Sequence, residues 1–363
     1  MLARSALFFI ALLSPLWAQA LESISLPPGF SIEEYAEVPN ARSLAQGENG
    51  TIFVSNRKGR SVYAVVPEDD GTRTIKLTRG MNAPNGIAVH NGDLYVAEIE
   101  RVTRYADIEN RLEDVPEAEE LAIELPSKRH HGWRYIGFGP DEKLYISVGA
   151  PCNVCDEPGF AEIIRMNPDG SERETYASGI RNSVGFTWHP DTQELWFTDN
   201  GRDMLGDNLP ACELNRAPRQ GLHFGFPYCH AGDLLDPKFG DGRNCADYTA
   251  PAQKLGPHVA PLGVRFYTGD MFPEQYRGQV FIAEHGSWNR TEKIGYRITL
   301  VRLENGNPVS YEPFAEGWLQ GESVSGRPVD LLILDDGSML VSDDLSGKLY
   351  RITYEEPLAA GGS

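Results

Sequence analysis

Positive charge is scarce in this chain. Its 363 residues include 33 Lys and Arg against 52 Asp and Glu, which gives a formal net charge of −19 at pH 7. No stretch concentrates Lys and Arg in the way that phosphate binding requires. We therefore expect no nucleic-acid partner, whereas a neutral small-molecule substrate and a basic redox protein such as a cytochrome are both compatible with the charge.

Long apolar runs are scarce too. The clearest one, residues 6–13 (ALFFIALL), is too short for a membrane-spanning helix. Arg4 precedes this run and the small-residue site Ala18-Gln19-Ala20 follows it, a combination that is typical of a cleavable signal peptide. We expect residues 1–20 to be removed and the mature chain to be periplasmic or secreted, with no membrane span. An uncleaved membrane anchor is the alternative.

Cysteine is limited to five residues. Cysteines of an exported protein usually pair, and we predict the disulfides Cys152–Cys155 and Cys229–Cys245, with Cys212 left free. Zinc binding would need a second Cys-x-x-Cys pair at motif spacing, which is missing. Haem attachment would need a His directly after the Cys-x-x-Cys, where the sequence has Asp. A redox-active pair or a metal clamp is the alternative to a structural disulfide here.

Helical periodicity is nearly missing, since Pro116 interrupts the best candidate, residues 108–122, which could hold a short turn. Instead one unit recurs: an alternating apolar run, a turn with Asp, Gly or Asn, a second run that ends in small or acidic residues, and a third apolar run. The six units are residues 44–66, 84–105, 135–166, 184–215, 263–303 and 328–354. Such repeats predict an all-β fold, a six-bladed β-propeller of four-stranded antiparallel blades, with residues 21–363 as a single domain.

Two stretches are too long for the repeating unit, and functional side chains are expected near them. Residues 200–210 and 226–261 are predicted to form loops that wall the mouth of the channel and govern substrate choice. Polar residues directly before a unit's first apolar run are also expected at this mouth. These residues are His130, His131, Arg181, Asn182 and Arg327. The fifth unit instead has His285, in the segment 284–290 after its second strand. His189, His223, His230, His258 and the six Trp are expected to be structural.

Three motifs lie in order on these units. His131 stands eight residues before the Gly of FGPDEKLY, residues 179–186 read GIRNSVGF, and DNGR at 199–202 is followed by ELN at 213–215 and HFGFP at 223–227. Together they resemble the glucose/sorbosone dehydrogenase family, and AEHGSWNR and GAPCNVC resemble its sorbosone-dehydrogenase-like branch. The likeness covers most of the chain after residue 26. It implies a soluble quinoprotein that holds pyrroloquinoline quinone (PQQ) and calcium, oxidises a sugar or similar polyol, and passes electrons to a cytochrome or quinone acceptor.

The resemblance also implies residue roles. His131 would be the general base for the substrate hydroxyl, with His130 as the alternative, and hydride would pass to the quinone. Arg181 and Asn182 would contact the quinone, with Arg181 stabilising its developing negative charge. The remaining implied contacts are Arg327 with a cofactor carboxylate and the carbonyls of Gly201 and Arg202 with calcium. His285 could line the rest of the rim, a position that no motif match assigns.

Each of these residues also has a structural interpretation. His131 and His130 could be an ordinary loop pair, Arg181 could cap a blade through an ion pair, Arg327 could brace the sixth blade, and Gly201 could be a turn glycine.

Two positions depart from the family pattern. Ala150 stands where glucose-type members have an acidic residue that orients the catalytic His, so the base needs another partner. Cys212 stands where the family often has Asp. These departures speak against glucose-type activity more than against PQQ binding.

Two other functions compete with this interpretation. A calcium-dependent lactonase of the six-bladed gluconolactonase type would use the NAPNGI segment at 82–87, with a metal held by Asn85, Asn182 and Asp199. A non-catalytic propeller that binds a protein or a glycan would not need His131. The three functions differ in cofactor, which is PQQ, a metal alone, or neither.

Overall fold

The computed structural model describes residues 21–357, so the expected signal peptide, residues 1–20, lies outside them. Strands make up nearly all of the regular structure, together with the short 3-10 helices η1 (Ile108–Arg111), η2 (Cys245–Asp247) and η3 (Glu274–Tyr276). The turn expected within residues 108–122 is η1. Within residues 21–357, no helix has the length and apolar character needed to cross a bilayer.

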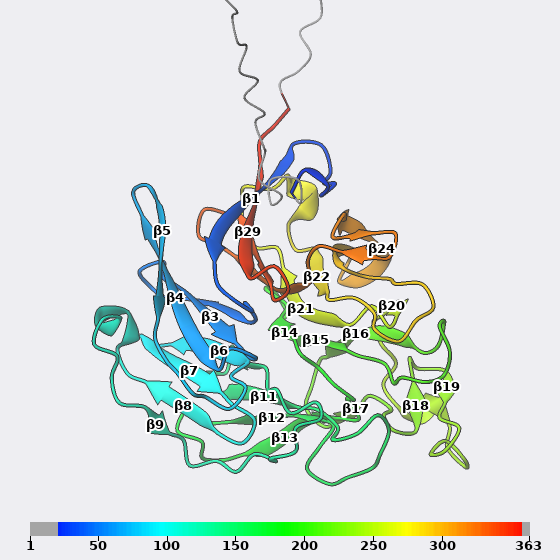
Figure 1. Cartoon of the computed structure of the whole chain (residues 1–363). Coiled ribbons are helices and arrows are strands. Elements are labelled where there is room, and N and C mark those ends of the chain that lie inside the picture. Colours follow the sequence, from blue (N-terminus) through cyan, green and yellow to red (C-terminus); the bar gives the residue numbers. More distant parts are fainter. Residues whose placement is uncertain (1–20, 358–363) are drawn as a thin grey trace, which may run out of the picture.

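The predicted six-bladed propeller is confirmed, and its sheets form a ring (Figure 1). Blade 1 contains β2 (Leu44–Gln46), β3 (Ile52–Asn56), β4 (Ser61–Glu68) and β5 (Gly71–Lys76). Blade 2 contains β6 (Gly86–His90), β7 (Asp93–Ala97), β8 (Val102–Tyr105) and β9 (Glu119–Glu120). Blade 3 contains β10 (Ile136–Phe138), β11 (Leu144–Val148), β12 (Glu162–Met166) and β13 (Glu174–Ser178). It gains a fifth, parallel strand, β17 (Leu222–His223), which the four-strand pattern did not predict.

The second half of the ring follows the same plan. Blade 4 contains β14 (Phe186–Trp188), β15 (Leu195–Asp199), β16 (Ala211–Ala217) and β20 (Gln253–Pro257). Blade 5 contains β21 (Pro261–Phe266), β22 (Val280–Glu284), β23 (Arg297–Glu304) and β24 (Asn307–Ala315). Blade 6 contains β27 (Pro328–Ile333), β28 (Met339–Asp343), β29 (Lys348–Tyr354) and β1 (Phe30–Glu37). Two small hairpins are β18 (Cys229–His230) with β19 (Leu234–Leu235), and β25 (Leu319–Gln320) with β26 (Ser323–Val324).

The ring closes through its first and last strands. β1 pairs antiparallel with β29, from Phe30 opposite Tyr354 to Glu37 opposite Lys348. The fourth strand of blade 6 therefore comes from the start of the described chain, and Figure 1 shows the blue β1 beside the red β29. The six units predicted from the sequence do not include this strand, because it lies before the first repeat.

The second strands of the blades explain why the repeat is visible in the sequence. The strands β3, β11, β15, β22 and β28 are buried at every position. Because neighbouring blades pack face to face, both faces of these strands are covered, and the strands read as continuous apolar runs. Each first strand runs antiparallel to its second strand, so the start of one and the end of the other share one end of the ring. We call this end the mouth.

Both predicted disulfides, Cys152–Cys155 and Cys229–Cys245, are confirmed, and Cys212 is free and buried. The expectation that residues 226–261 form only a connecting loop was wrong. Their last part supplies β20, the outer strand of blade 4, and begins β21. The sequence concealed β20 because an outer strand is half exposed and has no continuous apolar run.

Ring closure gives a stability prediction. The half-buried ring of Phe30, at the start of β1, lies edge-on to Phe272, Tyr276 and Phe314 of blade 5, with ring centroids 4.7, 5.2 and 5.0 Å away. Phe30→Ala should lower the free energy of unfolding by about 3 kcal/mol, because it removes this contact and leaves a cavity. Urea unfolding followed by tryptophan fluorescence measures the change. The neighbouring Ser31→Ala, which removes only an exposed hydrogen bond to Thr353, is the control and should cost under about 0.5 kcal/mol. Equal stability of the two variants would contradict the closure argument.

Candidate active site

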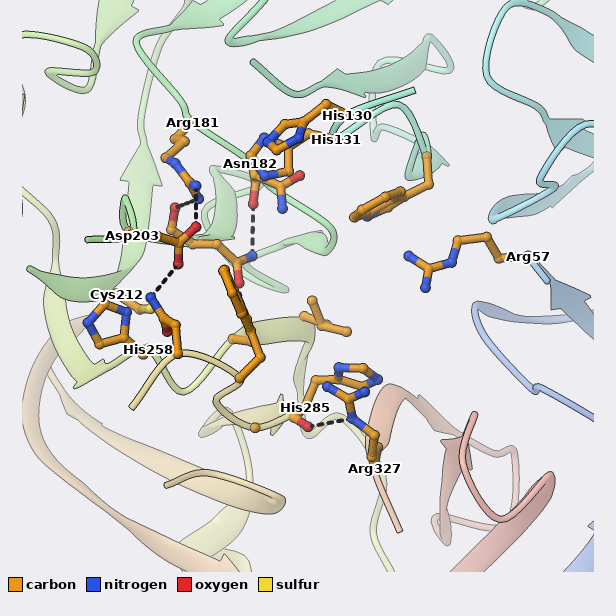
Figure 2. Close-up of a pocket in the computed structure, with 18 of the residues that line it drawn as sticks. Arg57, His130, His131, Arg181, Asn182, Asp203, Cys212, His258, His285 and Arg327 are labelled. Atoms are coloured by element: carbon orange, nitrogen blue, oxygen red, sulfur yellow. Dashed lines mark hydrogen bonds and ion pairs between the residues drawn. The ribbon is translucent and has the colours of Figure 1, made fainter. Parts of the chain in front are cut away.

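A cavity of about 470 Å³ lies at the mouth and is lined by residues of blades 1, 3, 4, 5 and 6. Its predicted members are His130, His131, Arg181, Asn182, Gly201, His285 and Arg327. Figure 2 shows the two adjacent His, Arg181, Arg57, and the pair His285 and Arg327 arranged around this space. The structure thus brings together side chains that are nearly 200 positions apart in the sequence. Arg202 does not line the cavity, because its guanidinium turns away and forms an ion pair with Asp236.

His131 is held in a defined orientation by the backbone. Its Nδ1 lies 2.8 Å from the carbonyl oxygen of Ala150. A carbonyl only accepts hydrogen bonds, so Nδ1 carries the proton and Nε2 keeps its lone pair. Ala150 stands where the family pattern has an acidic side chain that orients the catalytic His. The backbone carbonyl of Ala150 therefore takes over this contact with His131.

The backbone at His131 is unusual and depends on a glycine. His131 has a φ of 48°, in the left-handed region that non-glycine residues seldom adopt. A Cβ on Gly149 would lie 2.7 Å from the Cβ of His131, so only glycine allows this approach. The strand end of blade 3 and the preceding loop together fix the imidazole.

The His131 ring is neutral. Burial, then the positive charge of Arg181 and the neighbouring His130, lower the pKa of His131 to about 2. The residue is 8% exposed and lines the cavity. An unprotonated, oriented imidazole is the form that can accept a proton.

Arginine is concentrated at this mouth although the chain is acidic overall. Arg42 forms an ion pair with Asp344 at 3.0 Å, and Arg181 forms one with Asp203 at 3.0 Å. Arg57 and Arg327 also line the cavity.

These last two arginines form no ion pair with any residue in the described part of the chain. The guanidinium of Arg57 lies 4.4 Å from the ring centre of Trp133. Burial and the nearby Arg42 lower the pKa of Arg57 to about 9, which leaves it charged at pH 7. The Nε of Arg327 donates to the carbonyl of His285 at 3.3 Å. Neither arginine has a direct ion-pair partner among residues 21–357, although the Asp344 carboxylate, paired with Arg42, interacts electrostatically with both.

The guanidinium of Arg181, predicted to contact the quinone, already makes several hydrogen bonds within the protein. It donates to the carbonyl and side-chain oxygens of Asn153 at 2.8 and 3.0 Å, to the carbonyl of Asn200 at 3.1 Å, and to Asp203 at 3.0 Å. Four of its five N–H groups are therefore used within the protein. Arg181 does brace the blade, as the structural interpretation proposed, and its charge still acts on the cavity through space. The side-chain amide of Asn182 makes no hydrogen bond to the residues described and faces the cavity.

A second buried imidazole, that of His285, is linked through Asp344 to Arg42. The Nε2 of His285 lies 2.9 Å from Asp344, which also accepts from Arg42. Burial alone would raise the pKa of Asp344. The hydrogen bond from His285 and the charge of Arg42 instead hold this pKa far below its usual range. Burial lowers the pKa of His285 to about 4, so this ring is neutral as well.

Several lining residues were missed by the sequence analysis. Arg42 directly precedes the first unit's apolar run, so the rule that selected Arg327 also applies to it. Arg57 directly follows the second strand of its blade, as His285 does. Inspection of the residues after each second strand would therefore have found Arg57. His258, Trp133 and Trp288, which were expected to be structural, line the cavity. Trp288 lies in the segment 284–290 already singled out in the sequence, whereas no sequence pattern distinguished His258 and Trp133 from core residues.

The metal ligands considered for a lactonase do not assemble. Asn85 is committed to Arg42 and to the carbonyl of Arg134, at 3.0 and 2.9 Å. The Asp199 carboxylate accepts the backbone N–H groups of Arg181 and Asn182 at 2.8 and 2.7 Å. Between residues 21 and 357, no three His, Cys, Asp or Glu side chains cluster as a metal site.

The fold is that of known propeller oxidoreductases. The PQQ domain of pyranose dehydrogenase from Coprinopsis cinerea, in its holo form, matches with a TM-score of 0.78 at 19% identity, over 91% of this chain and 97% of that chain. The calcium structure of a Trichoderma reesei enzyme of Carbohydrate-Active Enzymes Family AA12 matches with a TM-score of 0.81 at 20% identity, over 92% of this chain and 97% of that one. At these identities the likeness establishes the architecture.

Sequence comparison then gives the family. The chain belongs to the Glucose / Sorbosone dehydrogenase family, whose model matches residues 37–285, and a TrAA12-like model matches residues 233–355. An uncharacterized protein of Borreliella burgdorferi is 31% identical over 97% of this chain and 96% of its own length. Quinoprotein glucose dehydrogenase B of Acinetobacter calcoaceticus is 23% identical over 62% of this chain, and the match spans 57% of that enzyme. The resemblance inferred from the motifs is confirmed, and the chain is an oxidoreductase of the sugar dehydrogenase type.

The neutral state of His131 gives a pH prediction. Its folded pKa lies below the ordinary value of about 6.5, so the unfolded chain binds one more proton as the pH falls. Stability should therefore decrease on acidification from about pH 6.5, by about 1.4 kcal/mol per pH unit for this group. In His131→Gln the slope of unfolding free energy against pH, measured by urea unfolding between pH 4.5 and 7, should be smaller by that amount. Identical slopes in the two proteins would show that His131 titrates normally.

Proposed function

We propose that this protein oxidises an aldose or a sorbosone-like sugar by PQQ-dependent hydride transfer, with His131 as the general base. One observation carries the proposal. Two arginines without a direct ion pair, Arg57 and Arg327, line the same cavity as a neutral imidazole whose Nε2 is free to accept a proton. The names of relatives agree with it, since a pyrroloquinoline quinone-dependent pyranose dehydrogenase of Coprinopsis cinerea is 29% identical over 30% of this chain.

The cavity fits the chemistry of the cofactor. PQQ is a planar tricarboxylate, and a buried cation without a counter-charge is costly to keep. A bound carboxylate would offset this cost at Arg57 and at Arg327, whose planar guanidinium groups match carboxylate geometry. The free amide of Asn182 and the ring of His285 offer further polar contacts from the same walls.

Calcium is proposed as the second component. The carbonyl oxygens of Gly201 and Arg202 accept no hydrogen bond from residues 21–357, so they are available to a hard cation. Of the two residues, only Gly201 lines the cavity. Calcium takes six to eight oxygen ligands, and the nearby Asp203 is already occupied by Arg181 and Asn289. Most of the remaining ligands would therefore come from the cofactor and water, and calcium binding should depend on PQQ.

The residues around the cavity divide the reaction between them. When bound, PQQ supplies an acceptor for the two electrons of the substrate C–H bond. His131 takes the hydroxyl proton on Nε2, while its Nδ1–H stays on the Ala150 carbonyl and stabilises the cation that forms. Arg181, fixed by its four hydrogen bonds, presents positive charge that favours negative charge in the cavity. The electrons then pass to an acceptor outside the protein, a cytochrome or a quinone, in the periplasm or the secreted medium.

The first test separates the two adjacent imidazoles. In protein reconstituted with PQQ and calcium, His131→Gln should lower kcat for sugar-dependent dye reduction by about 10²- to 10⁴-fold, because the proton acceptor is lost. PQQ affinity should change less than about threefold. His130→Gln should lose less than about tenfold, since the exposed His130 ring lacks the Ala150 contact. Full activity of His131→Gln would contradict the assignment, and a selective loss in His130→Gln would move the base to that residue.

The second test concerns the unpaired arginines. Arg57→Gln and Arg327→Gln should each weaken PQQ binding by about 10- to 100-fold, the effect of one charge-assisted hydrogen bond. Titration of the apoprotein with PQQ, followed by tryptophan quenching, measures the affinity. Arg277→Gln is the matched control, because this exposed arginine lies at the opposite end of the ring between β21 and β22. The proposed cofactor position is wrong if all three variants bind PQQ like the parent protein.

A further inference from the structure

A second hollow adjoins the cavity and extends away from it. This hollow, of about 400 Å³, is lined by Arg57, Lys58, Arg60, Asn82, Ala83, Ile99, Arg129 and Trp133, and we call it the basic groove. It lies between blades 1, 2 and 3 at the mouth, because residues 57–60 follow β3, residues 82–83 precede β6, and Ile99 follows β7. Arg57 and Trp133 line both spaces, so the groove and the cavity adjoin at these two side chains.

The groove carries four positive side chains that lack acidic partners. Within residues 21–357, none of Arg57, Lys58, Arg60 and Arg129 forms an ion pair, although the chain has 52 acidic residues. Neutral acceptors hold two of them instead. Arg60 donates to the carbonyls of Met81 and Gly80, both at 2.9 Å, and Arg129 donates to the side chain of Asn82 at 3.4 Å.

The acidic groups near the groove offset this charge only in part. Asp344 acts electrostatically on Arg57, but its direct partners are Arg42 and His285. Glu98 is buried and forms an ion pair with Arg101. Glu100 is exposed and reaches only the side-chain amide of Asn82, at 3.4 Å. The groove therefore keeps a positive excess in a protein of net charge −19, and such a local potential attracts anions.

The position of Trp133 links the groove to the proposed chemistry. Its ring lies edge-on to His131, with centroids 6.2 Å apart, and Arg57 covers it at 4.4 Å. A ligand whose reacting carbon lies at His131 would reach the groove by extending over the Arg57–Trp133 pair. Because the groove is concave and Arg57 is largely buried within it, a small ligand fits better than the face of a protein.

We propose that the basic groove binds an anionic group of the substrate, so that the preferred sugar is one that carries a carboxylate, sulfate or phosphate next to the oxidised residue. This inference rests on the proposed function and specifies its substrate class. Lys58 and Arg129 are the specificity-determining residues, because both are exposed and lie outside the cavity proper. Arg57 serves both spaces and is left unchanged in the test.

The test compares a charged ligand with an uncharged one of the same shape. Calorimetry should show that trigalacturonate binds the protein at least tenfold more tightly than its methyl ester, both with and without PQQ, and that salt weakens the difference. The double variant Lys58→Gln/Arg129→Gln should remove most of this preference. Arg219→Gln/Arg277→Gln removes the same charge at the opposite end of the ring and should leave the preference unchanged. Galactose 6-sulfate and galactose 6-phosphate identify which anion is preferred.

Outcomes for the groove and for the cofactor are separable. If the protein does not bind PQQ but distinguishes trigalacturonate from its ester, the proposed function fails and the groove assignment stands. If PQQ-dependent sugar oxidation occurs and the acid and ester bind equally, the groove assignment is overturned alone. It is also overturned if the Lys58→Gln/Arg129→Gln variant changes only the reduction of an acidic acceptor protein, because the groove would then be a docking site for the acceptor.

Discussion

The pairing of β1 with β29 is the constraint on which the rest of the molecule depends. A blade cannot cover both faces of its own second strand, so each blade needs two neighbours, and an open ring would leave two blades half covered. Pairing of distant chain segments closes the ring and fixes the relative position of all six blades. The cavity walls come from blades 1, 3, 4, 5 and 6, so their geometry follows directly from this closure.

Electrostatics at the mouth is the second organising feature. In a chain of net charge −19, the mouth is a region in which arginines outnumber their ion-pair partners. Asp344 and Asp203 form ion pairs with Arg42 and Arg181, whereas Arg57 and Arg327 have no direct ion-pair partner among residues 21–357. The same field explains why His131 stays neutral: protonation beside Arg181 in a buried site is unfavourable. One arrangement thus attracts an anion and keeps the base unprotonated.

The sequence was sufficient for the architecture, because the doubly covered second strands read as apolar runs at a regular spacing. Outer strands such as β1 and β20 escaped notice, since half-exposed strands have no such run. Polar residues at unit starts identified His131 and Arg327 correctly as mouth residues. The hydrogen bond from His131 to Ala150 was not predictable, because a backbone carbonyl acts as a partner whatever side chain it carries. The role of Arg181 as a brace likewise depends on loop contacts to Asn153 that no linear pattern encodes.

The central claim is that the mouth holds an anionic quinone against the imidazole of His131. A crystal structure of the protein grown with PQQ and calcium tests it most directly. The account predicts a planar density in the cavity, with carboxylates at Arg57 and Arg327 and the quinone edge facing Nε2 of His131. A cavity that stays empty at saturating PQQ, or a quinone bound away from His131, would contradict the account.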